Sequence, residues 1–144
     1  MPAPKLKTVM TPFPYSVDAE ASADEALQFM RHHKIRHLPV TQKGALKSMV
    51  SDRDIKLMLG PDFANPERSE LKVSDAMVDE CYIVDLDTPL HLVVRHMAEN
   101  RIGSAIVTRR GKLAGIFTAT DACRAFADYL DGGVIDDSED DDVA

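Results

Sequence analysis

The sequence predicts an α/β protein built from two copies of one strand-helix-strand-strand-helix unit. The first observation is an internal repeat: Met10 aligns with Met77 and Asp54 with Asp121, an offset of 67 residues that needs no gap. Between residues 8 and 55, 11 of 48 positions are identical to their counterparts. The second observation is that both copies show the same order of apolar patterns. Two copies are too few for a solenoid, so we expect one paired fold with pseudo-two-fold symmetry and two shared clefts.

The first copy opens with a short strand around Val17, followed by a helix that begins at Ser22. Ser22 and Glu25 have the spacing of a capping box, in which each side chain satisfies a backbone N–H at the helix start. Apolar residues then recur at helical spacing at positions 23, 26, 27 and 30. Two apolar runs, 38–40 and 46–50, flank a glycine-containing turn and predict a hairpin. A second helix follows the hairpin.

The second copy repeats this order with different residues at the helix start. Its opening strand lies around Val84, and its first helix is expected to begin with Thr88-Pro89, proline being tolerated at the first helical position. The helical face recurs at positions 90, 93, 94 and 97, and the hairpin is predicted from the apolar runs 105–107 and 113–117. Different helix starts therefore precede the same elements.

These patterns divide the chain into an N-terminal arm (1–7), repeat 1 (8–60), a linker (61–72), repeat 2 (73–130) and an acidic tail (131–144). The linker contains two prolines, which suits a surface connection. The tail has too few apolar residues to form a core, so we expect it to be disordered. It is interpreted as a solubilising extension, with binding to a basic partner as the alternative.

Charge and composition exclude several classes of protein. The net charge is −7, but seven of the 24 acidic residues follow Leu130, and the remaining 17 balance the 17 lysines and arginines. No broad basic face for nucleic acid is expected, and no apolar run approaches the ~18 residues of a membrane span. Cys81 and Cys123 lack a C-x-x-C spacing and no secretory leader is evident, which favours a reducing, cytoplasmic location.

A hydroxyl and a carboxylate recur three residues apart after each hairpin, as Ser51-x-x-Asp54 and Thr118-x-x-Asp121. One interpretation is helix capping, with the serine or threonine at the N-cap and the aspartate favoured by the helix dipole. The other is that the carboxylate accepts the hydroxyls of a ribose while free amides of the helix start face a ligand. The two roles are compatible.

Several motifs together are similar to a tandem pair of cystathionine-beta-synthase-type (CBS) domains, the Bateman module, which we expect here as a stand-alone protein. The resemblance covers residues 8 to about 128 and rests on six segments in the family's order: Val9-Met-Thr-Pro12, Lys34-Ile-Arg-His-Leu-Pro-Val40, Ser51-x-x-Asp54, Ala76-Met77, Arg101-Ile-Gly-Ser-Ala-Ile-Val107 and Gly115-Ile-Phe-Thr-x-x-Asp121. It implies two β-α-β-β-α units that enclose two clefts for an adenosine-containing ligand: AMP, ADP, ATP, NAD or S-adenosylmethionine. It also implies assembly into a homodimer.

The resemblance assigns a role to residues at matching positions. The ribose is expected at Asp54 and Asp121, supported by Ser51 and Thr118. Adenine contacts are expected from Tyr15, Ile35, Ile116, Tyr82, Ile102 and Gly103. Phosphate contacts are expected from Arg36, His37, Arg53 and Ser104. Each cleft is expected to be composite, with Asp121 beside Tyr15, Ile35 and Arg36, and Asp54 beside Tyr82, Ile102 and Gly103.

The two copies differ at these positions. Arg36-His37 becomes Gly103-Ser104, and Arg53 becomes Thr120. Because a fixed positive fork suits phosphate, we expect polyphosphate binding to favour the Asp54 cleft. Ser48 stands where the second copy has Gly115, which predicts a narrower Asp54 cleft and is compatible with occupation of only one of the two clefts.

The leading hypothesis is a non-enzymatic regulatory module that requires no metal and no cofactor. An adenosine-type ligand would shift the population between two packings and alter a surface presented to an unidentified protein effector. The rival hypothesis is a ligand-free dimerisation or protein-docking module. An enzyme ranks last because the sequence has no glycine-rich phosphate loop, no carboxylate cluster for a metal and no nucleophile with an adjacent base.

Overall fold

The structure is a computed structural model that describes residues 4–12, 14–60, 70–78 and 81–132. The chain forms two compact units. Residues 14–81 make up the first, which we call the Asp54 unit. Residues 1–13 and 82–144 make up the second, the Asp121 unit.

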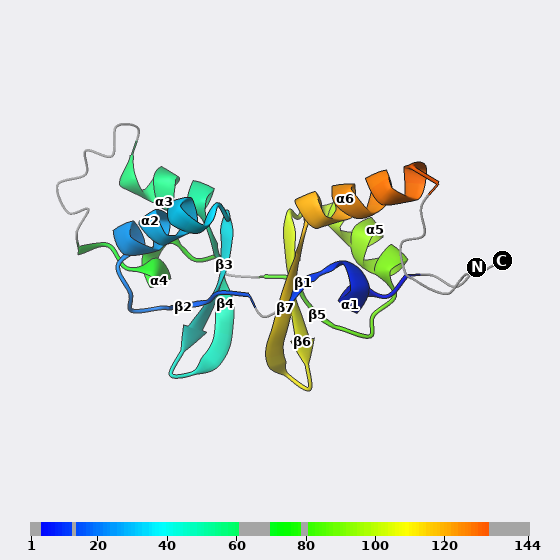
Figure 1. The fold of residues 1–144 in the computed structure, drawn as a ribbon. Coiled ribbons are helices and arrows are strands. Elements are labelled where there is room, and N and C mark those ends of the chain that lie inside the picture. Colours follow the sequence, from blue (N-terminus) through cyan, green and yellow to red (C-terminus); the bar gives the residue numbers. More distant parts are fainter. Residues whose placement is uncertain (1–3, 13, 61–69, 79–80, 133–144) are drawn as a thin grey trace. The chain divides into compact units, whose positions relative to one another are not determined.

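The Asp54 unit has a three-stranded sheet in the order β2-β3-β4, with β2 parallel to β3 and β3 antiparallel to β4. Its helices lie against one face of this sheet (Figure 1). The elements are β2 (Val17–Asp18), α2 (Ala23–His33), β3 (His37–Gln42), β4 (Ala45–Ser51), α3 (Asp52–Leu59) and α4 (Val73–Ala76).

The Asp121 unit has a four-stranded sheet in the order β1-β7-β6-β5. Here β5 runs parallel to β6, while β6 and β1 run antiparallel to β7. The elements are α1 (Leu6–Val9), β1 (Thr11–Pro12), β5 (Ile83–Asp85), α5 (Leu90–Asn100), β6 (Ser104–Arg109), β7 (Lys112–Thr118) and α6 (Ala119–Leu130).

Both copies contain the predicted strand, helix, strand, strand and helix, which confirms the α/β class and the two repeats. The hairpins turn at Lys43-Gly44 and Arg110-Gly111, all four with positive φ between 53° and 79°. Positive φ at both central residues matches the twist of a two-residue hairpin, which is why glycine is needed there. Ser22 caps α2 by accepting from the Glu25 N–H at 3.2 Å. Pro89 is the N-cap of α5, so this helix begins at Leu90, one residue later than predicted.

The compact units do not coincide with the sequence repeats, because the short helix at the start of each repeat packs on the other repeat. Leu6 of α1 is fully buried in a core with Val84 and Phe117 of the second copy. Val73 of α4 is fully buried in the core of the first copy with Leu38. Burial of Leu6 and Val73 therefore places residues 6–12 in the unit of the second copy and residues 71–78 in the unit of the first.

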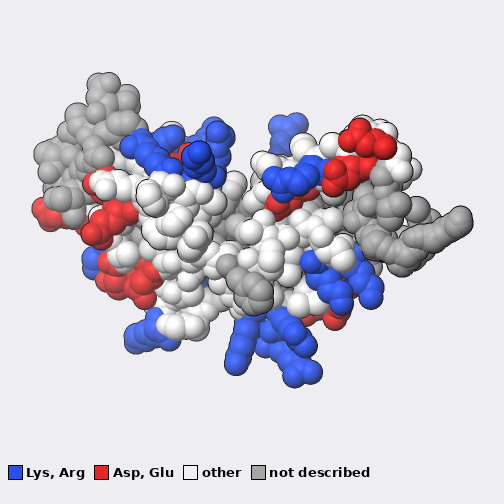
Figure 2. Space-filling model, viewed as in Figure 1, with Lys and Arg blue, Asp and Glu red and all other residues white. Residues whose placement is uncertain are grey.

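Charged side chains of both signs are spread over the surface, with basic ones at the turn of each hairpin (Figure 2). No helix of the described residues is long and apolar enough to cross a membrane. Most of the predicted linker, residues 61–69, and of the predicted acidic tail, residues 133–144, lies outside the described residues.

Candidate functional site

Asp54 lies in the first turn of α3, directly after β4. Its Oδ2 accepts a hydrogen bond from the Ser51 N–H at 3.1 Å, and its own N–H donates to Ser51 Oγ at 3.0 Å. This reciprocal capping box holds the carboxylate at the helix start. The side chain is half-buried, and its Oδ1 accepts no hydrogen bond from the described residues. One oxygen of Asp54 is therefore free to accept a donor from a ligand.

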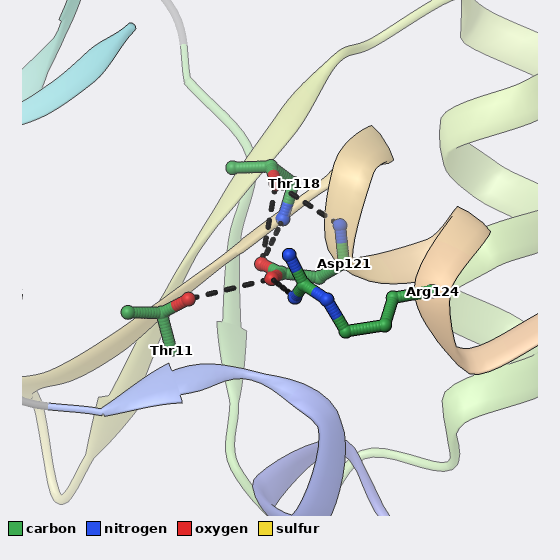
Figure 3. A network of polar contacts seen from close by, with 4 residues as sticks. All are labelled: Thr11, Thr118, Asp121 and Arg124. Carbon is green, nitrogen blue, oxygen red and sulfur yellow. Dashed lines mark hydrogen bonds and ion pairs between the residues drawn. The ribbon is translucent and has the colours of Figure 1, made fainter. Parts of the chain in front are cut away.

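Asp121 occupies the same place on α6 but is more enclosed, with 5% of its surface exposed. Its Oδ2 accepts from the Thr118 N–H at 2.9 Å and the Thr118 hydroxyl at 3.2 Å. Its Oδ1 accepts from Arg124 Nη1 at 3.1 Å and from the Thr11 hydroxyl at 3.4 Å (Figure 3). Both oxygens of this carboxylate are thus held by the chain's own donors.

Thr11 and Arg124 were not among the predicted site residues. The repeat offset places Val78 opposite Thr11 and Leu57 opposite Arg124, so the Asp54 unit has neither donor at the matching positions. The signal for Arg124 was present, because a basic residue three positions after an aspartate on a helix is within reach of its carboxylate. No local pattern connects Thr11 with Asp121, since β1 reaches β7 only in the folded unit.

The hairpins bring the predicted phosphate residues next to the capping boxes. In the Asp54 unit, His37 is paired with Ser51 in the sheet, and the Arg36 carbonyl accepts from the Asp52 N–H at 3.0 Å. In the Asp121 unit, Ser104 is paired with Thr118 in the same way. The Gly103 carbonyl likewise accepts from the Ala119 N–H at 2.9 Å.

His37 is half-buried beside two carboxylates and one guanidinium. Burial lowers its pKa below the usual 6.5, an effect that Asp52 and Asp54 oppose and Arg36 reinforces. The imidazole is therefore uncharged at neutral pH. Permanent positive charge near Asp54 comes from Arg36 and Arg53, both of which have exposed side chains.

The two predicted adenine tyrosines take equivalent positions. The Tyr15 ring packs on Phe29, with ring centroids 5.1 Å apart, and on His33 at 4.4 Å. The Tyr82 ring packs on His96 at 4.2 Å, and burial raises the pKa of its phenol. Both rings therefore rest on the side of the first helix of their copy, in edge-on or tilted contact with its aromatic side chains.

The predicted isoleucines belong partly to the cores. Ile35 and Ile102 are half-buried and pack against the core of their own unit, directly after α2 and α5. Ile116 is 6% exposed in β7 and is paired with Thr11 of β1. A ligand reaches such residues through backbone groups more readily than through the buried side chains.

Ser48 and Gly115 occupy the same place before the two capping boxes and are both buried. The Ser48 hydroxyl donates to the Val78 carbonyl at 2.6 Å. At Gly115 an added Cβ would lie 2.8 Å from the Thr11 carbonyl oxygen and 2.7 Å from Met10 Sδ. The space that the Ser48 side chain fills in the Asp54 unit is thus filled in the Asp121 unit by Met10 and by Thr11 of β1, which lie close to Gly115.

The predicted residues fall into two groups. Asp54, Ser51, Arg36, His37, Arg53, Tyr15 and Ile35 belong to the Asp54 unit, and the other seven belong to the Asp121 unit. The composite clefts stay a prediction. Within the part of the chain that the structure describes, no three His, Cys, Asp or Glu side chains are grouped so as to hold a metal ion.

Comparison with known proteins identifies both repeats. Residues 6–60 and 73–128 match the CBS domain family. The zinc metalloprotease MJ0392 of Methanocaldococcus jannaschii is 32% identical over 123 residues, which is 85% of this chain and 32% of that protein. The chain therefore spans about a third of the length of this relative.

Two solved structures share the fold. The CBS domain pair of protein MJ0100, in complex with 5′-methylthioadenosine and S-adenosyl-L-methionine, is 23% identical with a TM-score of 0.76, covering 88% of this chain and 98% of that chain. CBSX2 in complex with AMP is 26% identical with a TM-score of 0.74, over the same shares of the two chains.

Proposed function

The chain belongs to the CBS domain family, and from this premise we propose that it is a regulatory module that binds an adenosine-containing ligand. The candidates are AMP, ADP, ATP, NAD and S-adenosylmethionine. Support comes from the two solved relatives, one of which holds AMP and the other methylthioadenosine with S-adenosylmethionine. The ligand acts as a signal and not as a cofactor.

The observation that carries the proposal is the pair of aspartates held at the starts of α3 and α6. A carboxylate oxygen there is a charged acceptor suited to the two adjacent hydroxyls of a ribose. Asp54 Oδ1 accepts no hydrogen bond from the described residues, so a ribose can bind it without breaking an existing contact. Arg36 and Arg53 supply positive charge for phosphate near this carboxylate.

Regulation follows if the ligand binds one conformation of the module more tightly than another and so shifts the population. The output is expected at an effector protein, with the module as a homodimer in the cytoplasm. Two cysteines without a disulfide, Cys81 and Cys123, fit a reducing compartment. We propose no catalytic role, since the match to the metalloprotease covers only 32% of that enzyme.

A second candidate is a docking or dimerisation module that needs no ligand. The observation that favours it is one face of α6, where three large apolar side chains are more than half exposed: Phe126, Tyr129 and Leu130. Their spacing places them on the same side of the helix. Replacing Phe126 and Leu130 by serine would then abolish self-association measured by light scattering, with or without nucleotide.

The proposed function is tested by calorimetry of the full chain with each of the five candidates and with adenosine. We expect at least one to bind and to raise the melting temperature. Asp54→Asn and Asp121→Asn should each weaken binding at their own position, because the amide carries no charge. Binding of none of these ligands, together with no small molecule released from the purified protein in a mass spectrum, would contradict the proposal.

A further inference from the structure

We infer that Arg124 makes the Asp121 position select ribosides that carry a phosphate over uncharged ribosides. This inference rests on the proposed function, because it concerns the ligand class accepted by the same carboxylate. It starts from the ion pair between Arg124 Nη1 and Asp121 Oδ1 at 3.1 Å. The aspartate is almost fully buried, whereas 65% of the arginine side chain is exposed.

Ribose hydroxyls must compete with the chain's own donors at this carboxylate. Oδ2 is committed to the capping box, since Thr118 donates both its N–H and its hydroxyl to that oxygen. Oδ1 is bound by Arg124 and by the Thr11 hydroxyl at 3.4 Å, the longest of the four contacts (Figure 3). A ligand that takes Oδ1 therefore displaces the guanidinium while the helix cap stays in place.

Displacement has a different consequence for charged and uncharged ligands. When an uncharged riboside such as adenosine binds, its hydroxyls replace the hydrogen bond between the Arg124 guanidinium and Asp121. The riboside has no charged group with which the displaced guanidinium could pair. A nucleotide brings phosphate oxygens, which a guanidinium binds through two parallel N–H groups. The exposed, flexible side chain of Arg124 can turn from the carboxylate to such a group. The interaction of Arg124 with the phosphate thus replaces the ion pair with Asp121 that the ribose breaks.

The Asp54 position lacks this device. Leu57 stands where α6 has Arg124 and is 72% exposed, so α3 presents no cation one turn after its aspartate. Asp54 Oδ1 has no hydrogen-bond donor among the described residues that a ligand would need to displace. An uncharged riboside can bind there without breaking an ion pair. The repeat therefore supplies a matched comparison at this one position, since Arg124→Leu and Leu57→Arg exchange the residues three positions after the two aspartates.

The experiment compares AMP with adenosine by calorimetry on full-length variants in which only one carboxylate remains. In Asp54→Asn, binding depends on Asp121, and we expect AMP to be preferred. Adding Arg124→Leu should reduce the ratio of the two association constants by roughly tenfold, the value of one charge-assisted hydrogen bond. Arg124→Lys should keep most of the preference because it keeps the charge. Melting curves verify that each variant is folded.

The reciprocal variant is Leu57→Arg in an Asp121→Asn background, where the preference for AMP should rise. If AMP and adenosine bind but the ratio is the same with and without Arg124, the inference is wrong and the proposed function stands. If the native chain binds but Asp54→Asn binds neither ligand, the Asp121 position takes no riboside, and the inference is also wrong. Failure of the native chain to bind any candidate ligand overturns the proposed function itself.

Discussion

The two carboxylates begin from the same local motif and end in different environments. Each aspartate closes a capping box with the hydroxyl residue three positions before it. Asp54 keeps one oxygen without a donor from the described residues, while Asp121 has four hydrogen bonds over its two oxygens. A capping motif thus fixes where the carboxylate lies, and residues outside the motif decide what it can still bind.

Part of the difference originates at the residue before the motif. Gly115 leaves room for β1, whose Thr11 lies beside β7 and within 3.4 Å of Asp121. Ser48 fills the matching space and ties the Val78 carbonyl with its own hydroxyl. Val78 has no hydroxyl to offer Asp54. Thr11 in place of Val78 therefore gives Asp121 a donor that Asp54 lacks, and Gly115 leaves the room for β1 to bring this donor close.

The largest difference between the two carboxylates is expected in their contribution to the free energy of unfolding. Asp121→Ala removes the acceptor for four hydrogen bonds, one of which closes the capping box of α6. We expect the free energy of unfolding to fall by about 2–3 kcal/mol, against about 1 kcal/mol for Asp54→Ala, which loses only the hydrogen bond from the Ser51 N–H. Urea unfolding of both variants measures the difference. Equal losses would mean that Thr11 and Arg124 add nothing to Asp121.

The next largest effect on the free energy of unfolding is expected from exchanging the two small residues, Gly115 and Ser48. Gly115→Ser brings a Cβ to 2.8 Å from the backbone carbonyl of Thr11, which must move, and overpacking of this kind costs about 1–3 kcal/mol. Ser48→Gly creates no clash but loses the hydrogen bond to Val78, so we expect about 1 kcal/mol. Unfolding midpoints compare the two. A larger loss for Ser48→Gly would show that β1 approaches β7 less closely than the glycine permits.

The sequence predicted the elements well because each carries a local signal. The hairpin turns at Lys43-Gly44 and Arg110-Gly111 and the capping boxes depend on residues at most three positions apart. The sequence did not predict that α1 and α4 each pack on the other repeat. Leu6 and Val73 are apolar residues that could be buried in either core, so their identity does not indicate which one. The same holds for Thr11, which reaches Asp121 across 110 residues of sequence.

A smaller effect concerns pH, since His37 of the first copy is replaced by Ser104 in the second. Burial lowers the pKa of the folded imidazole below 6.5, so in the window beneath 6.5 the unfolded chain binds more protons than the folded one. The free energy of unfolding should therefore fall as pH falls through this window. His37→Ser should remove that part of the pH dependence, measured by melting curves between pH 5 and 7.5 (roughly the range in which histidine titrates). An identical slope in both proteins would contradict the assignment.

The smallest effect is expected from an ion pair in which both side chains are exposed. Lys72 Nζ lies 2.7 Å from Glu20 Oε1 in the Asp54 unit, a shorter distance than that between Arg124 and Asp121. Both of its partners are more than half exposed, however, and the hydrogen bond to Glu20 raises the pKa of Lys72 without any burial to strengthen it. Water and salt screen such a pair almost completely. Lys72→Met should leave the melting temperature unchanged at moderate salt, whereas Arg124→Leu should lower it, because that substitution leaves a buried carboxylate with one donor fewer. A clear loss in Lys72→Met that vanished at high salt would mean that distance, and not burial of a partner, decides which of the two ion pairs stabilises its unit.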